Sequence, residues 1–209
     1  FRYLSGQKIL LASFVVDIVA MVFGMPRALF PQIAHETFGD PVQGGFVLGV
    51  LFAAMSVGAV VGGVFSGWLP RVRRQGLAVI VCIALWGVAM AGFGIVVWFA
   101  DSGGSALLVW LAVAFLAFGG AVDMVSAAFR STMLQTVATD EMRGRLQGVF
   151  IVVVAGGPRI GDVLHGAAAA AAGTAVAAAG GGVLVIVGVA VCVFAFPAFV
   201  RYRVGKTLS

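Results

Sequence analysis

The chain has 209 residues, of which 62% are hydrophobic and only 10% are charged, and its formal net charge is +5. A typical soluble domain is about 25% charged, so this composition excludes a water-soluble globular protein and indicates that lipid is its main solvent. The charges lie in short clusters between long apolar runs and not on one basic face, which argues against nucleic-acid binding.

Six apolar windows follow one another along the chain. A helix needs about 20 apolar residues to cross the hydrocarbon core of a membrane. We therefore expect an all-α, polytopic bundle of six transmembrane helices within residues 9–200, with spans at about 9–30, 45–69, 77–100, 106–128, 146–171 and 175–200. Residues 1–8 form a lead-in and residues 201–209 a basic tail. The turn between the last two spans is expected at Gly173–Thr174 or at Gly180–Gly182.

The arginine and lysine residues give the bundle a predicted orientation, because cytoplasmic loops collect them. Ten of the 13 fall on one side if the spans alternate, and the loops of the other side contain none: Arg2, Lys8, Arg71, Arg73, Arg74, Arg143, Arg145, Arg201, Arg203 and Lys206. We expect a multi-pass protein of the plasma membrane, surrounded by lipid, with both termini in the cytoplasm.

Six charged residues fall within or at the edge of the spans: Asp17, Arg27, Asp123, Arg130, Arg159 and Asp162. A charge near the bilayer centre costs roughly 2.5 to 3.5 kcal/mol, so each needs a partner or a function. Asp17 lies about 12 Å from the start of its span. Arg159 and Asp162 are three residues apart, within pairing reach on one helix face.

Two interpretations of these charges stay open. Either the charged residues form structural ion pairs between helices, or they line a polar pathway for substrate and protons. We assign Asp17, Arg159 and Asp162 to the pathway, and Arg27, Asp123 and Arg130 to helix pairing or gating. The side chain of Arg130 is expected at the cytoplasmic boundary, where it can reach water. His165, one turn after Asp162, could extend a proton relay.

Small and helix-breaking residues also mark particular spans. The pairs Gly58/Gly62 and Gly63/Gly67 let helices approach closely, either for tight packing or for sliding. Gly156, Gly157 and Pro158 predict a bend beside Arg159. The sequence has no His-x-x-Glu-His pattern and no cluster of metal ligands, so we expect no enzyme activity, no cofactor and no metal.

Four stretches resemble the C-terminal six-helix half of a major facilitator superfamily transporter, within it the enterobactin-exporter type of permease. They are FRYLSGQKIL leading into MPRALFPQIA, then GWLPRVRRQGLAVI, DMVSAAFRSTMLQTVATDEMRGRLQGVF and VVVAGGPRIGD. Gly67 with Arg71, Arg73 and Arg74 is similar to the superfamily's loop motif, which gates the cytoplasmic side, although the usual aspartate is missing. Gly148, Gly157, Pro158 and Gly161 partly resemble a glycine-proline motif of antiporters.

The resemblance implies proton-driven export of a siderophore such as enterobactin, or of a related amphipathic compound, by two six-helix halves with the substrate between them. The expected partners are therefore an N-terminal six-helix half, a small-molecule substrate and protons. The first residue is Phe1, and we expect the chain to be a fragment of a longer transporter. Two alternatives stay open: a multidrug efflux permease, or a non-transporting half-transporter module.

Overall fold

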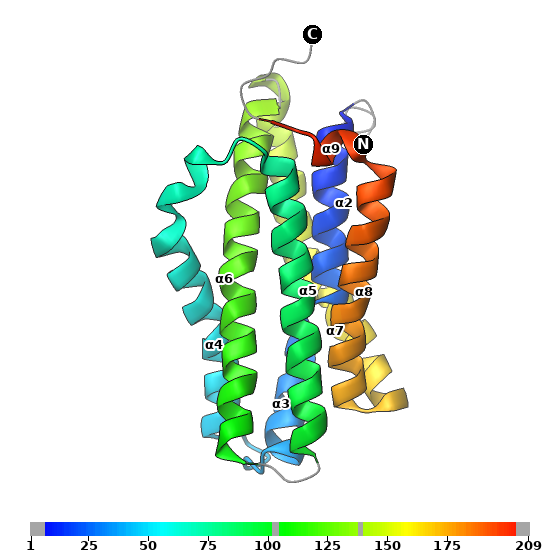
Figure 1. Ribbon diagram of the computed structural model, residues 1–209. Helices are drawn as coiled ribbons and strands as arrows, with labels where there is room; N and C mark the ends of the chain where they lie inside the picture. The colour runs from blue at the N-terminus through cyan, green and yellow to red at the C-terminus, as the bar shows by residue number, and fades with distance from the viewer. Residues whose placement is uncertain (1–6, 102–104, 138–139, 204–209) are drawn as a thin grey trace.

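The computed structural model describes residues 7–101, 105–137 and 140–203. Within these ranges the regular secondary structure is entirely helical, and six helical segments are long and apolar enough to cross a membrane. The expected all-α bundle of six transmembrane helices is therefore confirmed. The segments stand roughly side by side along one axis (Figure 1).

In the described residues, eleven helical elements form or directly follow these six segments. The first comprises α2 (Lys8–Phe23), the 3-10 turn η1 (Pro26–Leu29), α3 (Phe30–Gln32) and the π-helical turn η2 (Ile33–Thr37). The second comprises α4 (Phe46–Val64) and the 3-10 segment η3 (Phe65–Arg71). The others are α5 (Gln75–Ala100), α6 (Ala106–Val137), α7 (Asp140–Ala172), and α8 (Thr174–Ala195) followed by α9 (Pro197–Val200).

Two ends of the bundle can be distinguished. We call the end that holds the start of α2, the start of α5 and α9 the basic end; it lies at the top of Figure 1. It carries Arg71, Arg73, Arg74, Arg201 and Arg203, while Arg2 and Lys206 lie outside the described residues. The side chain of Arg145 in α7 is exposed. The side chain of Arg143, like Arg2 and Lys206, is not among the described parts of the structure. The orientation of the basic end toward the cytoplasm remains a prediction.

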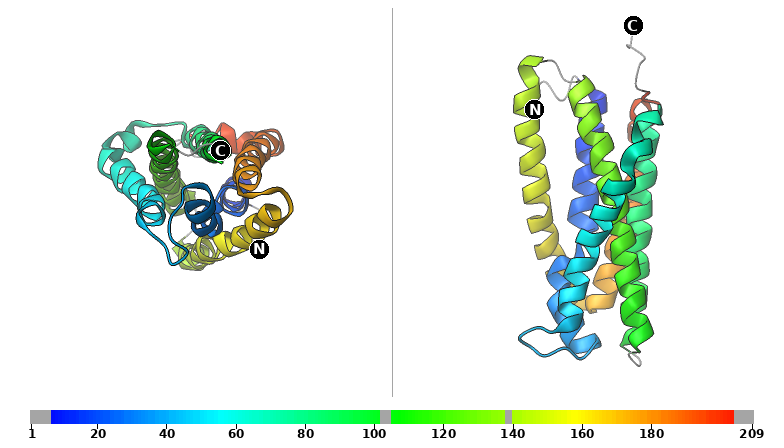
Figure 2. Two further views of the ribbon diagram at one scale, coloured as in Figure 1. Left: turned by 90° about the horizontal axis from the view of Figure 1, so that it is seen from below. Right: turned by 90° about the vertical axis from the view of Figure 1, so that its left-hand side faces the viewer.

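Helix α2 lies near the middle of the bundle, as the left view of Figure 2 shows. It contacts α5, α6, α7 and α8, whereas α5 packs extensively between α6 and α8, and α4 packs on α6. The apolar core follows these contacts, with Trp86, Phe93, Leu116 and Phe129 almost fully buried. The first span therefore presents its middle residues to neighbours from several elements.

Glycine allows α4 and α6 to approach closely. A methyl group at Gly58 would overlap the backbone carbonyl of Ala117, and one at Gly62 would overlap that of Ala121. The first predicted small-residue pair thus packs against α6. In the second pair, a methyl group at Gly63 would make ordinary van der Waals contact with the Met124 side chain of α6, whereas one at Gly67 would have no atom within 4 Å.

The first span is interrupted between α2 and η1. Met25 has φ −114° and ψ 83°, outside the helical region, because proline disfavours a helical residue before it. Gly24 lies so close to Trp86 of α5 that a methyl group would overlap the indole nitrogen. The interruption at Gly24–Met25 is followed directly by Pro26 and by Arg27, whose side chain is exposed.

The last two spans turn at Gly173. This residue has φ +89°, a left-handed conformation that favours glycine, whereas Gly180–Gly182 lie inside α8. Helix α7 continues from Asp140 to Ala172 with Pro158 inside it. Bending at Gly156, Gly157 and Pro158 stays a prediction.

Candidate functional site

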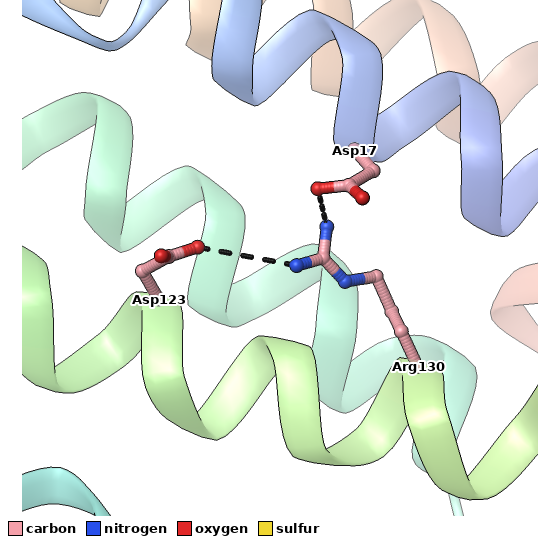
Figure 3. A network of polar contacts seen from close by, with 3 residues as sticks. All are labelled: Asp17, Asp123 and Arg130. Carbon is pink, nitrogen blue, oxygen red and sulfur yellow. Dashed lines mark hydrogen bonds and ion pairs between the residues drawn. The ribbon is translucent and has the colours of Figure 1, made fainter. Parts of the chain in front are cut away.

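A buried charge cluster joins the first and fourth spans. Arg130 of α6 donates a hydrogen bond from Nη1 to Oδ1 of Asp17 in α2, and its Nη2 lies 4.0 Å from Oδ1 of Asp123. Figure 3 shows the guanidinium between the two carboxylates. The side chains of Asp17 and Arg130 are only 1% and 2% exposed, and that of Asp123 is 31% exposed. One guanidinium thus contacts two carboxylates, of which that of Asp123 is more exposed than that of Asp17.

The spacing of charged and polar residues along α6 explains how this helix builds its part of the cluster. Asp123, Ser126 and Arg130 are separated by three and four residues, so they share one helix face. Ser126 is fully buried. Within the described part of the chain, Oγ of Ser126, Nε of Arg130 and Oδ2 of Asp17 have no hydrogen-bond partner. The cluster therefore holds polar atoms with spare hydrogen-bonding capacity.

The position of Arg130 corrects one expectation. Its side chain does not extend to water at the edge of the membrane but is buried beside Asp17. In a low-dielectric interior, the attraction between the guanidinium and the Asp17 carboxylate outweighs the hydration that Arg130 would gain at the nearby edge of the membrane. Nη2 of Arg130 lies 4.0 Å from Oδ1 of Asp123, and the assignment of these two residues to helix pairing or gating stays a prediction.

A second feature is an open cleft between the first, second and fifth spans. It has a volume of about 500 Å³ and is lined by Arg27, Phe52, Pro158, Arg159 and Asp162, together with small apolar side chains. Nη1 of Arg159 lies 3.8 Å from Oδ2 of Asp162. The Arg159 side chain is 85% exposed and that of Asp162 is 30% exposed. Because one acid faces two arginines, the cleft has an excess of positive charge.

The residues assigned to a pathway from the sequence thus separate into two places. Arg159 and Asp162 line the cleft, and they are joined there by Arg27. Asp17 is not among the residues that line the cleft; it contacts Arg130. Positions 17 and 27 of the first span are about 15 Å apart along a helix axis, so the cluster and the cleft lie at different depths of the bundle.

The remaining candidates lie away from both places. His165 is buried, with Nδ1 2.9 Å from the carbonyl oxygen of Gly161, and its Nε2 has no partner among the described residues. Arg71, Arg73 and Arg74 lie at the basic end and are exposed. In the described ranges, no group of three or more His, Cys, Asp or Glu side chains could hold a metal ion.

Two residues that sequence reasoning did not single out also shape these places. Ser126 is buried on the same helix face as Asp123 and Arg130. The spacing of three and four residues between them could have identified it from the sequence. Phe52 brings an aromatic ring of α4 to the cleft, where its ring packs edge-on against Phe30 with centroids 5.2 Å apart. No pattern in the sequence indicates that Phe52 faces the fifth span.

Comparison with known proteins finds relatives among the enterobactin exporters. The chain is 32% identical over 170 residues to the enterobactin exporter EntS of Escherichia coli O139:H28 and of Escherichia coli O157:H7, and equally to that of Escherichia fergusonii. The matched region covers 78% of this chain but only 37% of the length of each relative. No family model matches the chain, and no solved structure matches it.

Proposed function

Because this chain is homologous to enterobactin exporters of the major facilitator superfamily, and its six apolar helices fit one half of such a transporter, we propose that it forms the C-terminal half of a secondary active exporter. The homology is to a transporter and not to an enzyme. The chain is then a multi-pass membrane protein whose partner is a second six-helix half. Alternating access in such transporters comes from rocking of two half-bundles around a central site.

The cargo of this exporter is a siderophore or a related small amphipathic anion. The named substrate of the relatives supports the class, and the cleft supports its charge, since exposed Arg27 and Arg159 face one half-exposed acid. Arginine binds carboxylate and similar planar anions with paired hydrogen bonds. Phe52 and the two prolines Pro31 and Pro158 add apolar surface for the rest of the molecule.

Export is driven by protons that bind in the charge cluster. The observation that carries this part is the sharing of Arg130 by Asp17 and Asp123, one fully buried and one partly exposed. A carboxylate that loses its arginine partner in a lipid-surrounded bundle is strongly favoured to take up a proton. An exchange of Arg130 between its two acids would therefore link proton uptake to a movement of α6 relative to α2.

Cargo accumulation in cells tests this function. Cells that lack the gene are expected to retain the siderophore inside, and the complete transporter is expected to restore its release. Variants D17N and D123N should lower release at equal protein level, whereas Arg145→Gln, which changes an exposed arginine of α7 outside the cleft, should not. Retention of dyes or antibiotics without retention of siderophore would contradict the proposed cargo and favour multidrug efflux.

A further inference from the structure

We propose that the basic end of the bundle binds one anionic phospholipid, with its phosphate among Arg74, Arg201 and Arg203 and one acyl chain along α5. Two clefts carry this proposal. The first, of about 220 Å³, is lined by these three arginines with Leu77 and Val200. The second, of about 420 Å³, is almost wholly apolar and shares Arg74 and Leu77 with the first. A charged pocket thus continues into an apolar groove.

The charged pocket has a defined structure. Gly76, in the first turn of α5, lies so close to Phe199 that a methyl group would overlap the Phe199 carbonyl. The hydroxyl of Tyr202 lies 3.3 Å from Oγ1 of Thr136 at the end of α6. These contacts hold the residues after α9 across the start of α5, so Arg201 and Arg203 stay beside Arg74.

The charge of the pocket fits a phosphate. No acidic side chain lines either cleft in the described part of the chain. Helix α5 also begins here, at Gln75, without a side-chain cap. The unpaired N–H groups of a first turn and the helix dipole add positive potential at that point. Basic pockets at the ends of transmembrane helices bind anionic lipid headgroups.

The apolar groove fits an acyl chain. Trp68 of η3 and Phe129 of α6 form one wall, with ring centroids 6.2 Å apart, and Leu77, Val81 and Leu85 of α5 form the other. Trp68 and these three residues of α5 are each 36% to 47% exposed. In Figure 1 the second span leans away from α5 toward the basic end, where η3 lies.

The length of the groove distinguishes a lipid from a soluble phosphate. Arg74 and Leu85 are separated by about 16 Å along a helix axis. This is close to half of the roughly 30 Å hydrocarbon core, the depth that one acyl chain occupies. A soluble phosphate would use the arginines alone and leave the groove empty. The site is separate from the cleft of Arg27 and Arg159, so it does not depend on the proposed export function.

Native mass spectrometry of the purified full chain in detergent, titrated with phosphatidylglycerol, tests the headgroup pocket. The double variant R74Q/R203Q is expected to weaken binding about 10- to 30-fold, at about five-fold per arginine. The matched control R71Q/R73Q removes the same charge from the neighbouring loop, outside both clefts, and should change affinity less than two-fold. R74K/R203K should retain most of the affinity. Equal losses in both glutamine variants, or equal binding of phosphatidylcholine, would overturn the proposal.

A second pair of variants tests the groove. Val81→Trp fills it and should weaken phosphatidylglycerol binding at least five-fold, whereas Val191→Trp, at an exposed position of α8, should have no effect. Glycerol 3-phosphate at millimolar concentration is expected not to displace the lipid. If glycerol 3-phosphate displaces the lipid and Val81→Trp binds normally, the pocket is a site for soluble phosphate and the proposed lipid site is wrong.

Discussion

Asp17 of α2 and Arg130 of α6 form an ion pair that is almost completely buried, although 113 positions separate them in the chain. The pair connects the first span to the fourth, and Asp123 of the fourth span lies beside the same arginine. A buried pair is costly to assemble, and removal of one partner leaves an uncompensated charge. Loss of either partner is therefore expected to weaken the packing of α2 on α6.

Arg130→Gln should be the most destabilising change in the charge cluster. It leaves two carboxylates without a cation, and we expect it to lower the free energy of unfolding by about 3 to 5 kcal/mol. Asp17→Asn should cost less, because Asp123 is close enough to Arg130 to replace it. Unfolding of the purified protein in detergent, monitored by circular dichroism, measures both, and the double variant D17N/R130Q should recover part of the loss. A larger cost for Asp17→Asn than for Arg130→Gln would contradict this arrangement.

Gly58→Ala and Gly49→Ala form a matched pair in α4. A methyl group at Gly58 would overlap the carbonyl of Ala117, whereas one at Gly49 would meet nothing. We expect Gly58→Ala to lower the free energy of unfolding by about 1 to 3 kcal/mol, and Gly49→Ala to leave it unchanged or raise it by up to about 1 kcal/mol through helix propensity. Thermal unfolding of the two variants compares them, and equal stabilities would show that α4 and α6 do not pack as described.

The arginines of the cleft should select an anionic cargo. Arg159→Gln and Arg27→Gln are each expected to raise the concentration of siderophore needed for half-maximal export by about 10- to 150-fold, since each removes a charge-assisted contact of about 1.5 to 3 kcal/mol. Arg145→Gln is the control on the same helix. Export assays on intact cells measure the effect, and an unchanged concentration dependence in both cleft variants would remove their assigned role.

Single cysteines test the orientation of the bundle. Cys82 and Cys192 are buried and can be replaced by Ala to remove background labelling. With both termini in the cytoplasm, Val42→Cys, at a position 78% exposed, should react with a membrane-impermeant maleimide added to intact cells. Arg73→Cys should react only after the cells are opened. The reverse pattern would invert the topology and show that the arginine count misled the prediction.

The six spans could be predicted because each is a long apolar window, and length alone decides whether a helix can cross the hydrocarbon core. The turn between the last two spans was predicted at two places, both of which contain glycine. The structure has it at Gly173, whose left-handed conformation favours this residue. The continuation of α6 to Val137 could not be read from hydropathy, because a polar helix end lies outside the membrane-spanning window.

The candidate site was predictable in its parts but not in its assembly. Spacing along one helix identified the pairs Asp123–Arg130 and Arg159–Asp162, which share a face by helix geometry. It could not show that Asp17 meets Arg130, nor that Arg27 joins Arg159, because such contacts depend on how helices pack. Small residues such as Gly58 and Gly62 decide which helices approach closely, and a single sequence does not state their partners.

Siderophore uptake into everted membrane vesicles that contain the complete transporter tests proton-coupled export most directly. Such export requires uptake when a pH gradient, acidic inside, is imposed, loss of uptake when a protonophore collapses the gradient, and loss of gradient-driven uptake in D17N and D123N. Uptake that continues unchanged after the gradient has collapsed would contradict proton-coupled export through the cluster of Asp17, Asp123 and Arg130.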